Sequence, residues 1–462
     1  MAQRVAIPFL RPWMAVVLGA GISGLAGLFL AVRPQLGIAL VLAVFYTPLA
    51  FLALPAALVG WAPIPFIEHL PFVWVGPTFA LLLIFFAWLG TLPEQRRRGF
   101  PNLKGQKRPI GALFLMITWF ALSLAWAPVP TRGTEWLADY VIAGVVVMIF
   151  VTTIEEPRHV RGIMIAFVVG AALSVVAGFL VAGLDPAATA ADSNEGRLQG
   201  GGGDPNYLAA GLVPATVLAI GLMSRYRHPI GRIAFCFAIA IMMAGLVATE
   251  SRGGVVAAFA AAVAALVVLK HHRAQVLAGL VVIATVAGLW FAAFPSAWQR
   301  VTEFNGGGTG RTDLWRIALR VNAAHPFTGI GIGNFEAEAK LFVRRPGQLT
   351  FVRLIVDSPH VAHNTYLQIL AEDGIIGLVL YCTAAGAFLL TTRRASRELD
   401  RANLTDLAML ARALLVAEIS MLVAMFFITD GYDKRLWMLF ALGPVLVAIA
   451  RRHTDPRAVN AT

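Results

Sequence analysis

The sequence predicts an all-α polytopic membrane protein, and three observations support this prediction. Of its 462 residues, 58% are hydrophobic and 13% are charged, whereas soluble domains carry about a quarter charged residues. Apolar runs of about 17–25 residues recur from end to end, and each could cross about 30 Å of hydrocarbon as a helix. These runs lack the alternating pattern of an outer-membrane barrel strand, so only helices fit.

The apolar runs predict about 12 membrane spans, within a range of 12 to 14. Arg4 and Arg11 precede a first run that is longer than the core of a signal peptide and has no clear cleavage site, so we predict a span there. Four prolines in the second run predict a broken or re-entrant helix and leave the side of the N-terminus open. The predicted spans are 13–32, 36–58, 73–92, 110–127, 137–153, 162–183, 207–223, 233–249, 254–269, 276–294, 375–392, 406–428 and 436–450.

Basic residues in the loops predict the orientation of the chain. From the 110–127 span onward they fall on one side at every second crossing, which the positive-inside rule makes the cytoplasm. The net charge of +12 therefore reflects topology and contact with anionic lipid, and nucleic-acid binding is not expected. The two cysteines lie inside apolar runs, which supports neither a disulfide framework nor a thiolate metal site. The predicted outer loops are 128–136, 184–206, 250–253, 295–374 and 429–435.

Arg252 lies in a tight outer turn, Thr249-Glu-Ser-Arg-Gly-Gly254, between two predicted spans. An arginine at the end of a helix can anchor the chain at the interface, paired with Glu250. It can equally bind an anion at membrane level, helped by the free backbone N–H groups of the turn. The residues alone leave both interpretations open.

Arg311 begins an amphipathic segment in the long outer loop. Leu314, Ala318 and Val321 mark its apolar stripe, while Arg316 and Arg320 share the polar face. Two arginines four residues apart repel each other unless an anion lies between them. Either this is an interfacial helix that touches lipid headgroups, or its arginines bind the phosphates of a lipid-linked donor.

His363 lies just before Asn364, at the start of a helical stretch too long for the bilayer alone. We expect its first turns to stand above the membrane, with a break near Gly374 or Gly377. The histidine is either a satisfied polar residue or a general base. A metal site with His360 and Asp357 has no recognised signature, and we predict none.

Two further outer segments carry polar residues. Asp204 and Pro205 fit a helix cap and first turn, which leaves Asn206 free for a polar ligand. The segment Gly329-Ile-Gly-Ile-Gly-Asn334 follows His325-Pro326 rather than a strand, so we reject dinucleotide binding and predict a glycine-shaped turn.

At these residues the chain resembles the superfamily of O-antigen ligases and polymerases, bacterial envelope glycosyltransferases. The resemblance covers roughly residues 200–450 and includes a large periplasmic loop late in the chain. It rests on Ser251-Arg-Gly-Gly254, Gly310-Arg311 with Trp315, His325-Pro326 with Gly329-Ile-Gly-Ile-Gly-Asn334, and His363-Asn-Thr-Tyr-Leu367 with Gly374-Ile-Ile-Gly377.

The resemblance implies an inverting transfer, independent of metal and cofactor, of a glycan from undecaprenyl diphosphate to an acceptor hydroxyl. His363 would be the base that removes the acceptor proton, and Arg252, Arg311 and Arg316 would bind the donor diphosphate. Further substrate-binding candidates are Arg197, Asp204, Asn206, Asn364, Asp430 and Arg435, of which Asp430 and Arg435 rest on their position in the last outer loop alone.

The resemblance also implies a bacterial inner-membrane protein with its active site facing the periplasm. We expect N-terminal spans over 1–199, a ligase-like catalytic membrane region over 200–450 with its loop at 295–374, and a cytoplasmic tail over 451–462. An O-antigen ligase, with a lipid A–core acceptor, is the favoured interpretation. A polymerase that extends lipid-linked repeat units is the alternative, because the Asp204-Pro-Asn motif also occurs in such members. A transporter or flippase would need charged residues in mid-span, and these spans are nearly free of charge.

Overall fold

In a computed structural model the chain is all-α over the residues that the structure describes, which are 34–68, 75–184, 197–226, 228–270, 310–344 and 347–454 with isolated positions between 273 and 292. Nine helices in this part of the chain are long and apolar enough to cross a membrane. The protein is therefore a polytopic membrane protein. These helices are α4 (Val75–Arg97), α5 (Lys107–Ser123), α6 (Pro130–Thr153), α7 (Pro157–Leu184), α9 (Pro205–Met223), α10 (Pro229–Ala248), α17 (Thr365–Arg401), α18 (Thr405–Ala424) and α19 (Lys434–Thr454).

Two other predicted spans correspond to shorter or broken helices. The 36–58 run forms α2 (Pro34–Leu52) and α3 (Leu54–Trp61), separated at Ala53 and followed by a 3₁₀ turn, Ile64–Phe66. This agrees with the expected broken helix. The 254–269 run forms α11 (Arg252–Val268). The 13–32 span lies outside the described residues, and so does most of the 276–294 span.

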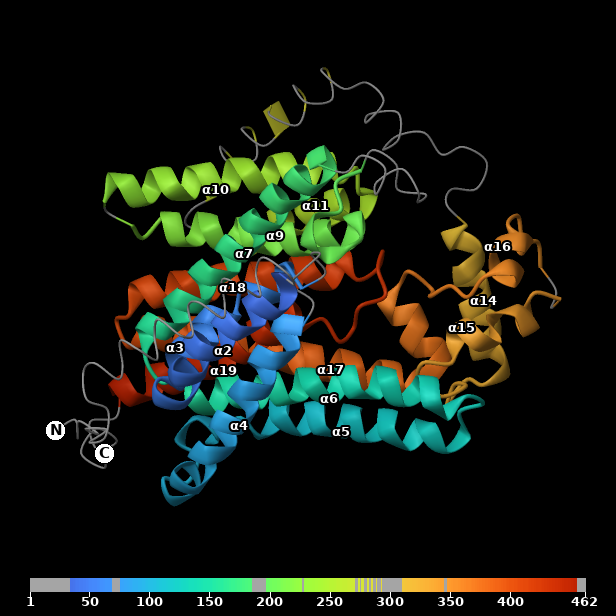
Figure 1. The fold of residues 1–462 in the computed structure, drawn as a ribbon, viewed down its shortest axis with the longest axis horizontal. Coiled ribbons are helices and arrows are strands. Elements are labelled where there is room, and N and C mark those ends of the chain that lie inside the picture. Colours follow the sequence, from blue (N-terminus) through green and yellow to red (C-terminus); the bar gives the residue numbers. More distant parts are fainter. Residues whose placement is uncertain are drawn as a thin grey trace.

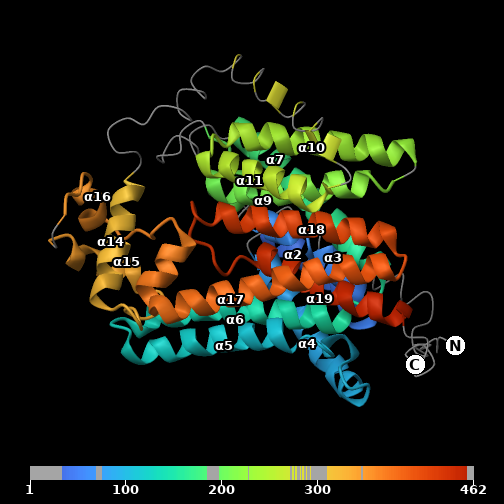
Figure 2. The same cartoon turned by 180° about the vertical axis from the view of Figure 1, so that it is seen from behind.

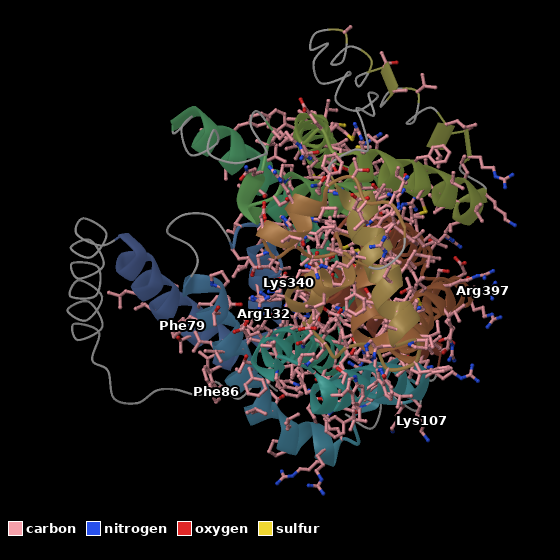
Figure 3. All side chains as sticks on the ribbon, turned by 90° about the vertical axis from the view of Figure 1, so that its right-hand side faces the viewer. Phe79, Phe86, Lys107, Arg132, Lys340 and Arg397 are labelled. Carbon is pink, nitrogen blue, oxygen red and sulfur yellow. The ribbon has the colours of Figure 1, made fainter. Side chains whose placement is uncertain are left out.

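The centre of the bundle is formed by α9, α17, α18 and α19, in which α18 packs against the other three and α17 packs against α19. The rings of Phe388 on α17 and Phe440 on α19 stack with centroids 5.4 Å apart, and Trp437 is fully buried beside them. Peripheral helices instead present apolar side chains outward, as Phe86 of α4 does in Figure 3. Such an outward apolar surface suits lipid, in which helices associate by close packing and not by exclusion of water.

Ion pairs join several basic loops at one end of the bundle. Glu155 lies 3.3 Å from Arg98 and 3.8 Å from Arg452, and Glu398 lies 3.7 Å from Arg451. The loops after α4 and α6 and the last turns of α17 and α19, which are far apart in the sequence, therefore share this end. That is the arrangement which the alternating charge pattern predicts.

The other end of the bundle carries a small cap made of three short helices, α14 (Arg311–Ala324), α15 (Phe335–Glu338) and α16 (Val352–Asp357). Figures 1 and 2 show these helices gathered beyond the ends of α5, α6 and α17. The cap has a hydrophobic core of its own, in which Leu314, Ile317 and Val321 of α14 pack with Phe335. The predicted amphipathic stripe of α14 is thus buried. We call this end of the molecule the site end.

A break in α17 fixes the cap to the bundle. Gly374 has φ 68° and ψ −170°, so the helix is interrupted there, as expected, whereas Gly377 does not interrupt it. The glycine turn that contains Gly329 lies against the break. Its backbone N–H groups at Ile330 and Gly331 donate to the carbonyl oxygens of Ala371 and Glu372 at 3.1 and 2.7 Å. The predicted glycine-shaped turn is a clamp on α17.

Alanine at either glycine of this clamp should strongly destabilise the protein. A Cβ at Gly329 would lie 2.2 Å from the carbonyl oxygen of Glu372, and one at Gly374 would lie 2.2 Å from that of Phe327. Both positions also have positive φ, which disfavours side chains. We expect a loss of several kcal/mol for each, read as a large drop in the thermal midpoint in detergent. Gly386→Ala, in the same helix with no atom within 4 Å of the new Cβ, is the matched control. Equal midpoints for all three variants would contradict the clamp.

Candidate functional site

The starts of four helices converge at the site end. Asp204 caps α9, Ser251 caps α11 just before Arg252, Arg311 is the first residue of α14, and His363 precedes the cap of α17. Charge interactions show that these groups are neighbours. Arg311 interacts electrostatically with Asp204 and Arg252, and His363 interacts with Arg311 and Asp204. Because helix N-termini carry partial positive charge and free N–H groups, this arrangement favours an anion.

His363 is held in a strained backbone conformation by its neighbours. Its φ is 49°, in the left-handed region that residues other than glycine seldom adopt. The N–H of Ala362 donates to Gln368 at 2.7 Å, and the N–H of Asn364 donates to Thr429 at 3.2 Å. Such strain persists only where the surroundings impose it, and it is concentrated at functional sites. The bonds on both sides of His363 impose it here.

The surroundings of His363 keep its imidazole neutral. Burial, with the positive charge of Arg311 second, lowers the pKa of His363 to about 4. Asp204 opposes this effect and His360 adds to it. The ring is therefore uncharged at neutral pH and can accept a proton from a bound hydroxyl group.

Arg311 is positioned by the segment that follows it. Burial lowers the pKa of this arginine, while the nearby Asp204 carboxylate raises it. Two residues on, Asp313 is fully buried, and its carboxylate accepts hydrogen bonds from the N–H groups of Thr350 and Phe351 at 2.6 and 2.7 Å. These bonds hold the first turn of α14 against the loop that leads to His363.

Arg316 and Arg320 face the same loop and not the helix N-termini. Arg316 donates to Asp313 at 3.0 Å and to the carbonyl oxygen of Gln348 at 3.1 Å. Arg320 donates to the carbonyl oxygens of Phe342, Val343 and Gly347. The arginines on the predicted polar face of α14 are thus bonded to groups of the protein itself, namely the Asp313 carboxylate and backbone carbonyl oxygens.

The outer turn at Arg252 is tied to the start of α9. The Ser251 hydroxyl donates to the side-chain oxygen of Asn206 at 2.9 Å, and Arg197 donates to the same oxygen at 3.2 Å. Asp204 caps α9 as predicted, accepting from the N–H of Asn206 at 2.7 Å. The expectation that Asn206 would be free for a ligand is wrong for its side-chain oxygen, which these two donors occupy. Asn206 and Arg197 hold the turn in place.

Asp430 and Arg435 belong to a buried ionic group whose main partner is Asp433, which the sequence did not single out. Arg435 is 6% exposed; its Nη2 lies 2.6 Å from a carboxylate oxygen of Asp433 and 3.7 Å from one of Asp430. Burial and the charge of Asp433 raise the pKa of Asp430 well above its ordinary value. Arg435 also donates to the carbonyl oxygen of Tyr207 on α9. This group joins α9 to α19.

The neighbours of Asp430 and Asn364 link that ionic group to His363. The N–H of Asp430 donates to the Thr365 hydroxyl at 3.0 Å, and that hydroxyl donates to Ile428. Asn364 caps α17 by accepting from the N–H of Leu367 at 3.0 Å. The loop between α18 and α19 therefore supports the backbone that carries His363.

His360 contacts Ser358, whose Oγ lies 2.9 Å from its Nε2. Within the residues that the structure describes, no group of three His, Cys, Asp or Glu side chains is arranged to hold a metal ion.

Sequence reasoning did not find the residues that hold these groups. Gln368 and Glu372, both buried in the first part of α17, form a chain in which Gln368 donates to Glu372 at 2.6 Å and Glu372 accepts from the N–H of Phe335 at 3.0 Å. Their i, i+4 spacing in an apolar helix was the available signal.

Glu418 in the middle of α18 is a further buried acid, hydrogen-bonded to Thr392 at 2.9 Å.

The fold and the site together define a multi-pass membrane protein with a cationic, partly buried site at one end of its helical bundle. A family model described as O-antigen ligase matches residues 237–382. Residues 237–382 of the chain therefore form an O-antigen ligase domain. A search of curated proteins found no match.

The family match covers part of the site. Arg252, Arg311, Arg316, His363 and Asn364 lie inside the matched residues, whereas Arg197, Asp204, Asn206, Asp430 and Arg435 lie outside them. Enzymes of this family are ligases or polymerases, and the family implies lipid-linked glycans as substrates. This agrees with a role in the biosynthesis of lipopolysaccharide or a related polysaccharide.

Proposed function

We propose that the protein is an O-antigen ligase, which transfers a glycan from undecaprenyl diphosphate to a hydroxyl group of lipid A–core on the periplasmic side of the inner membrane. The observation that carries the proposal is the meeting of Arg252, Arg311 and His363, two fixed cations beside a neutral base. The positive-inside rule applied to the basic loops gives the orientation, with about 12 spans.

The donor diphosphate binds where the helix N-termini converge. Arg311 and Arg252 contact its oxygens, and guanidinium groups bind such oxygens with two parallel hydrogen bonds. The N-terminal turns of α11 and α14 add N–H groups and partial positive charge. The carboxylate of Asp204 interacts electrostatically with Arg311 and favours its charged form. Arg316 is a weaker donor ligand in this scheme, because Asp313 already engages its guanidinium.

The reaction is a single displacement with inversion. An acceptor hydroxyl gives its proton to the imidazole of His363 while its oxygen forms a bond to the anomeric carbon of the glycan. The bond from that carbon to the diphosphate oxygen breaks, and the electron pair leaves with undecaprenyl diphosphate. Arg311 and Arg252 offset the negative charge that develops on the leaving group, so the proposed reaction needs no metal ion or other cofactor.

Donor binding should raise the basicity of His363. In the free enzyme the positive Arg311 helps to hold the pKa of His363 near 4, which makes the imidazole a weak base. A bound diphosphate brings negative charge next to both residues and so favours the protonated imidazole. Proton acceptance thus becomes easier when the donor is in place.

The dependence of the rate on pH tests this arrangement. Protonation of His363 removes the base, so kcat/KM for the donor should fall only below about pH 5, through the pKa near 4 of the free enzyme. The acid limb of kcat, which reports the donor complex, should lie at higher pH. Transfer is measured in nanodiscs from pH 4 to 8 at limiting and saturating donor. A kcat/KM that falls through an apparent pKa of 6.5 or above, the ordinary range for histidine, would contradict the proposed surroundings of His363.

Deletion of the gene distinguishes the ligase from the polymerase. A ligase mutant should accumulate full-length chains on the lipid carrier and lack them on lipid A. Single repeat units without long chains would instead identify a polymerase. Restoration of the wild-type pattern by the intact protein, and not by a His363→Ala variant, completes the test.

A further inference from the structure

A second group of side chains at the site end is not used by the proposed transfer. The rings of Trp136 on α6 and Tyr432 in the α18–α19 loop pack edge to face, with centroids 5.5 Å apart and planes at 85°. Tyr432 packs in the same way against Tyr140 at 5.6 Å. Gly333 lies against Trp136, since a Cβ there would be 3.0 Å from its ring. Trp136 and Tyr432 are half-buried, so both rings are fixed yet reach the surface.

Polar groups without protein partners accompany these rings. Asp139 lies on α6 three residues after Trp136 and is half-buried. The positive charge that acts on Asp139 is that of Lys434, and Lys434 already donates a hydrogen bond to Glu68 at 2.8 Å. Among the described residues, neither the Asp139 carboxylate, the Trp136 indole N–H nor the Tyr432 hydroxyl has a hydrogen-bond partner. Because these half-buried groups reach the surface and no protein group occupies them, they can form hydrogen bonds with a ligand that lies on the two rings.

This group borders the candidate site. Gly431, next to Tyr432, packs between Tyr140 and Thr365, because a Cβ there would lie 2.3 Å from the Tyr140 hydroxyl and 2.9 Å from the Thr365 methyl group. Thr365 is two residues from His363. Tyr207 interacts electrostatically with both Asp204 and Tyr432, which connects the group to the donor side as well.

We propose that Trp136, Asp139 and Tyr432 form a subsite for a sugar residue of the acceptor; this inference rests on the proposed function. A sugar ring has an apolar C–H face and a rim of hydroxyl groups. Fixed aromatic rings cover such a face, while the Asp139 carboxylate accepts from hydroxyls and the Trp136 N–H donates to them. Asp139 and Glu68 repel the diphosphate of the donor, which directs its anionic part to the arginines and leaves this subsite to an uncharged sugar.

Kinetics of the full-length protein in nanodiscs test the subsite. Asp139→Asn and Trp136→Phe should each raise the KM for the acceptor about tenfold and leave the donor KM unchanged. Phe86→Ala on the outward face of α4 is the control, and it should alter neither KM. Thermal midpoints establish that the variants are folded. Tyr432→Phe, which keeps the aromatic ring and removes the hydroxyl group, is measured in the same assay. An unchanged acceptor KM in folded Asp139→Asn and Trp136→Phe would overturn the proposal.

Direct binding separates this inference from the proposed reaction. Two probes, lipopolysaccharide that lacks O-antigen and an undecaprenyl-diphosphate-linked repeat unit, are titrated onto His363→Ala protein with and without Asp139→Asn. Weaker binding of the first probe alone supports a lipid A–core acceptor, and weaker binding of the second supports a growing glycan. If Asp139→Asn leaves the binding of each probe unchanged, the proposed subsite is overturned. Wild-type protein that binds a probe through Asp139 and transfers nothing would overturn the proposed function and leave the subsite standing.

Discussion

Replacement of His363 by asparagine should lower the rate of glycan transfer by about 10²–10⁴-fold, the contribution of a positioned general base. Asparagine tolerates the left-handed conformation that His363 adopts at φ 49°, so the loop keeps its shape. The loss therefore reports the imidazole and not the backbone. The measurement is the single-turnover rate with saturating donor and acceptor.

The stability of the same variant provides the control. His363→Asn should unfold at the same temperature as the wild type or slightly above, because asparagine tolerates the left-handed conformation in which the half-buried His363 is strained. Donor binding should persist, since Arg252 and Arg311 remain. A folded His363→Asn protein that transfers glycan at the wild-type rate would exclude His363 as the base.

Lysine at Arg311 or Arg252 should lower kcat/KM for the donor by about 10–100-fold. Each substitution keeps the charge and removes the planar fork that binds two phosphate oxygens at once. A lost charge-assisted hydrogen bond accounts for about 1.5–3 kcal/mol, which corresponds to that range. The measurement is the donor dependence of the initial rate for each variant.

Arg397→Lys is the matched control for these substitutions. Arg397 is an exposed arginine of α17, seen at the edge of the molecule in Figure 3, and its replacement should change neither constant. An Arg311→Lys or Arg252→Lys protein with the donor affinity of the wild type would remove that arginine from the diphosphate site.

Much of the fold was predictable because a bilayer restricts the chain to apolar helices of one length range. The spans from 73 to 249 and from 375 to 450 each correspond to a described helix, and the break at Gly374 was expected from a glycine in an overlong helix. The cap could be anticipated less well. The apolar stripe of α14 could be recognised, but its burial in the cap was not predicted, and the clamp depends on a hydrogen bond between Gly331 and Glu372, which are 41 positions apart. No local pattern encodes such a contact.

The site divides in the same way. Arg252, Arg311 and His363 could be singled out because charged and ionisable groups at membrane level are unusual. What holds them could not be predicted. Asp433 is the main partner of Arg435, and Gln368 and Thr429 fix the backbone beside His363. A capping motif gives no sign that Ser251 from another turn will occupy the side-chain oxygen of Asn206, whose role in substrate binding stays a prediction. Partners of this kind come from tertiary packing.

The most direct test of the central claim is the stoichiometry of one turnover by purified protein in nanodiscs, in the presence of a chelator. The donor is an undecaprenyl-diphosphate-linked glycan with known anomeric configuration. The proposed reaction predicts one molecule of undecaprenyl diphosphate released for each glycan transferred, with an inverted linkage in the product. Retention of configuration, or transfer only after a divalent metal ion is restored, would contradict it.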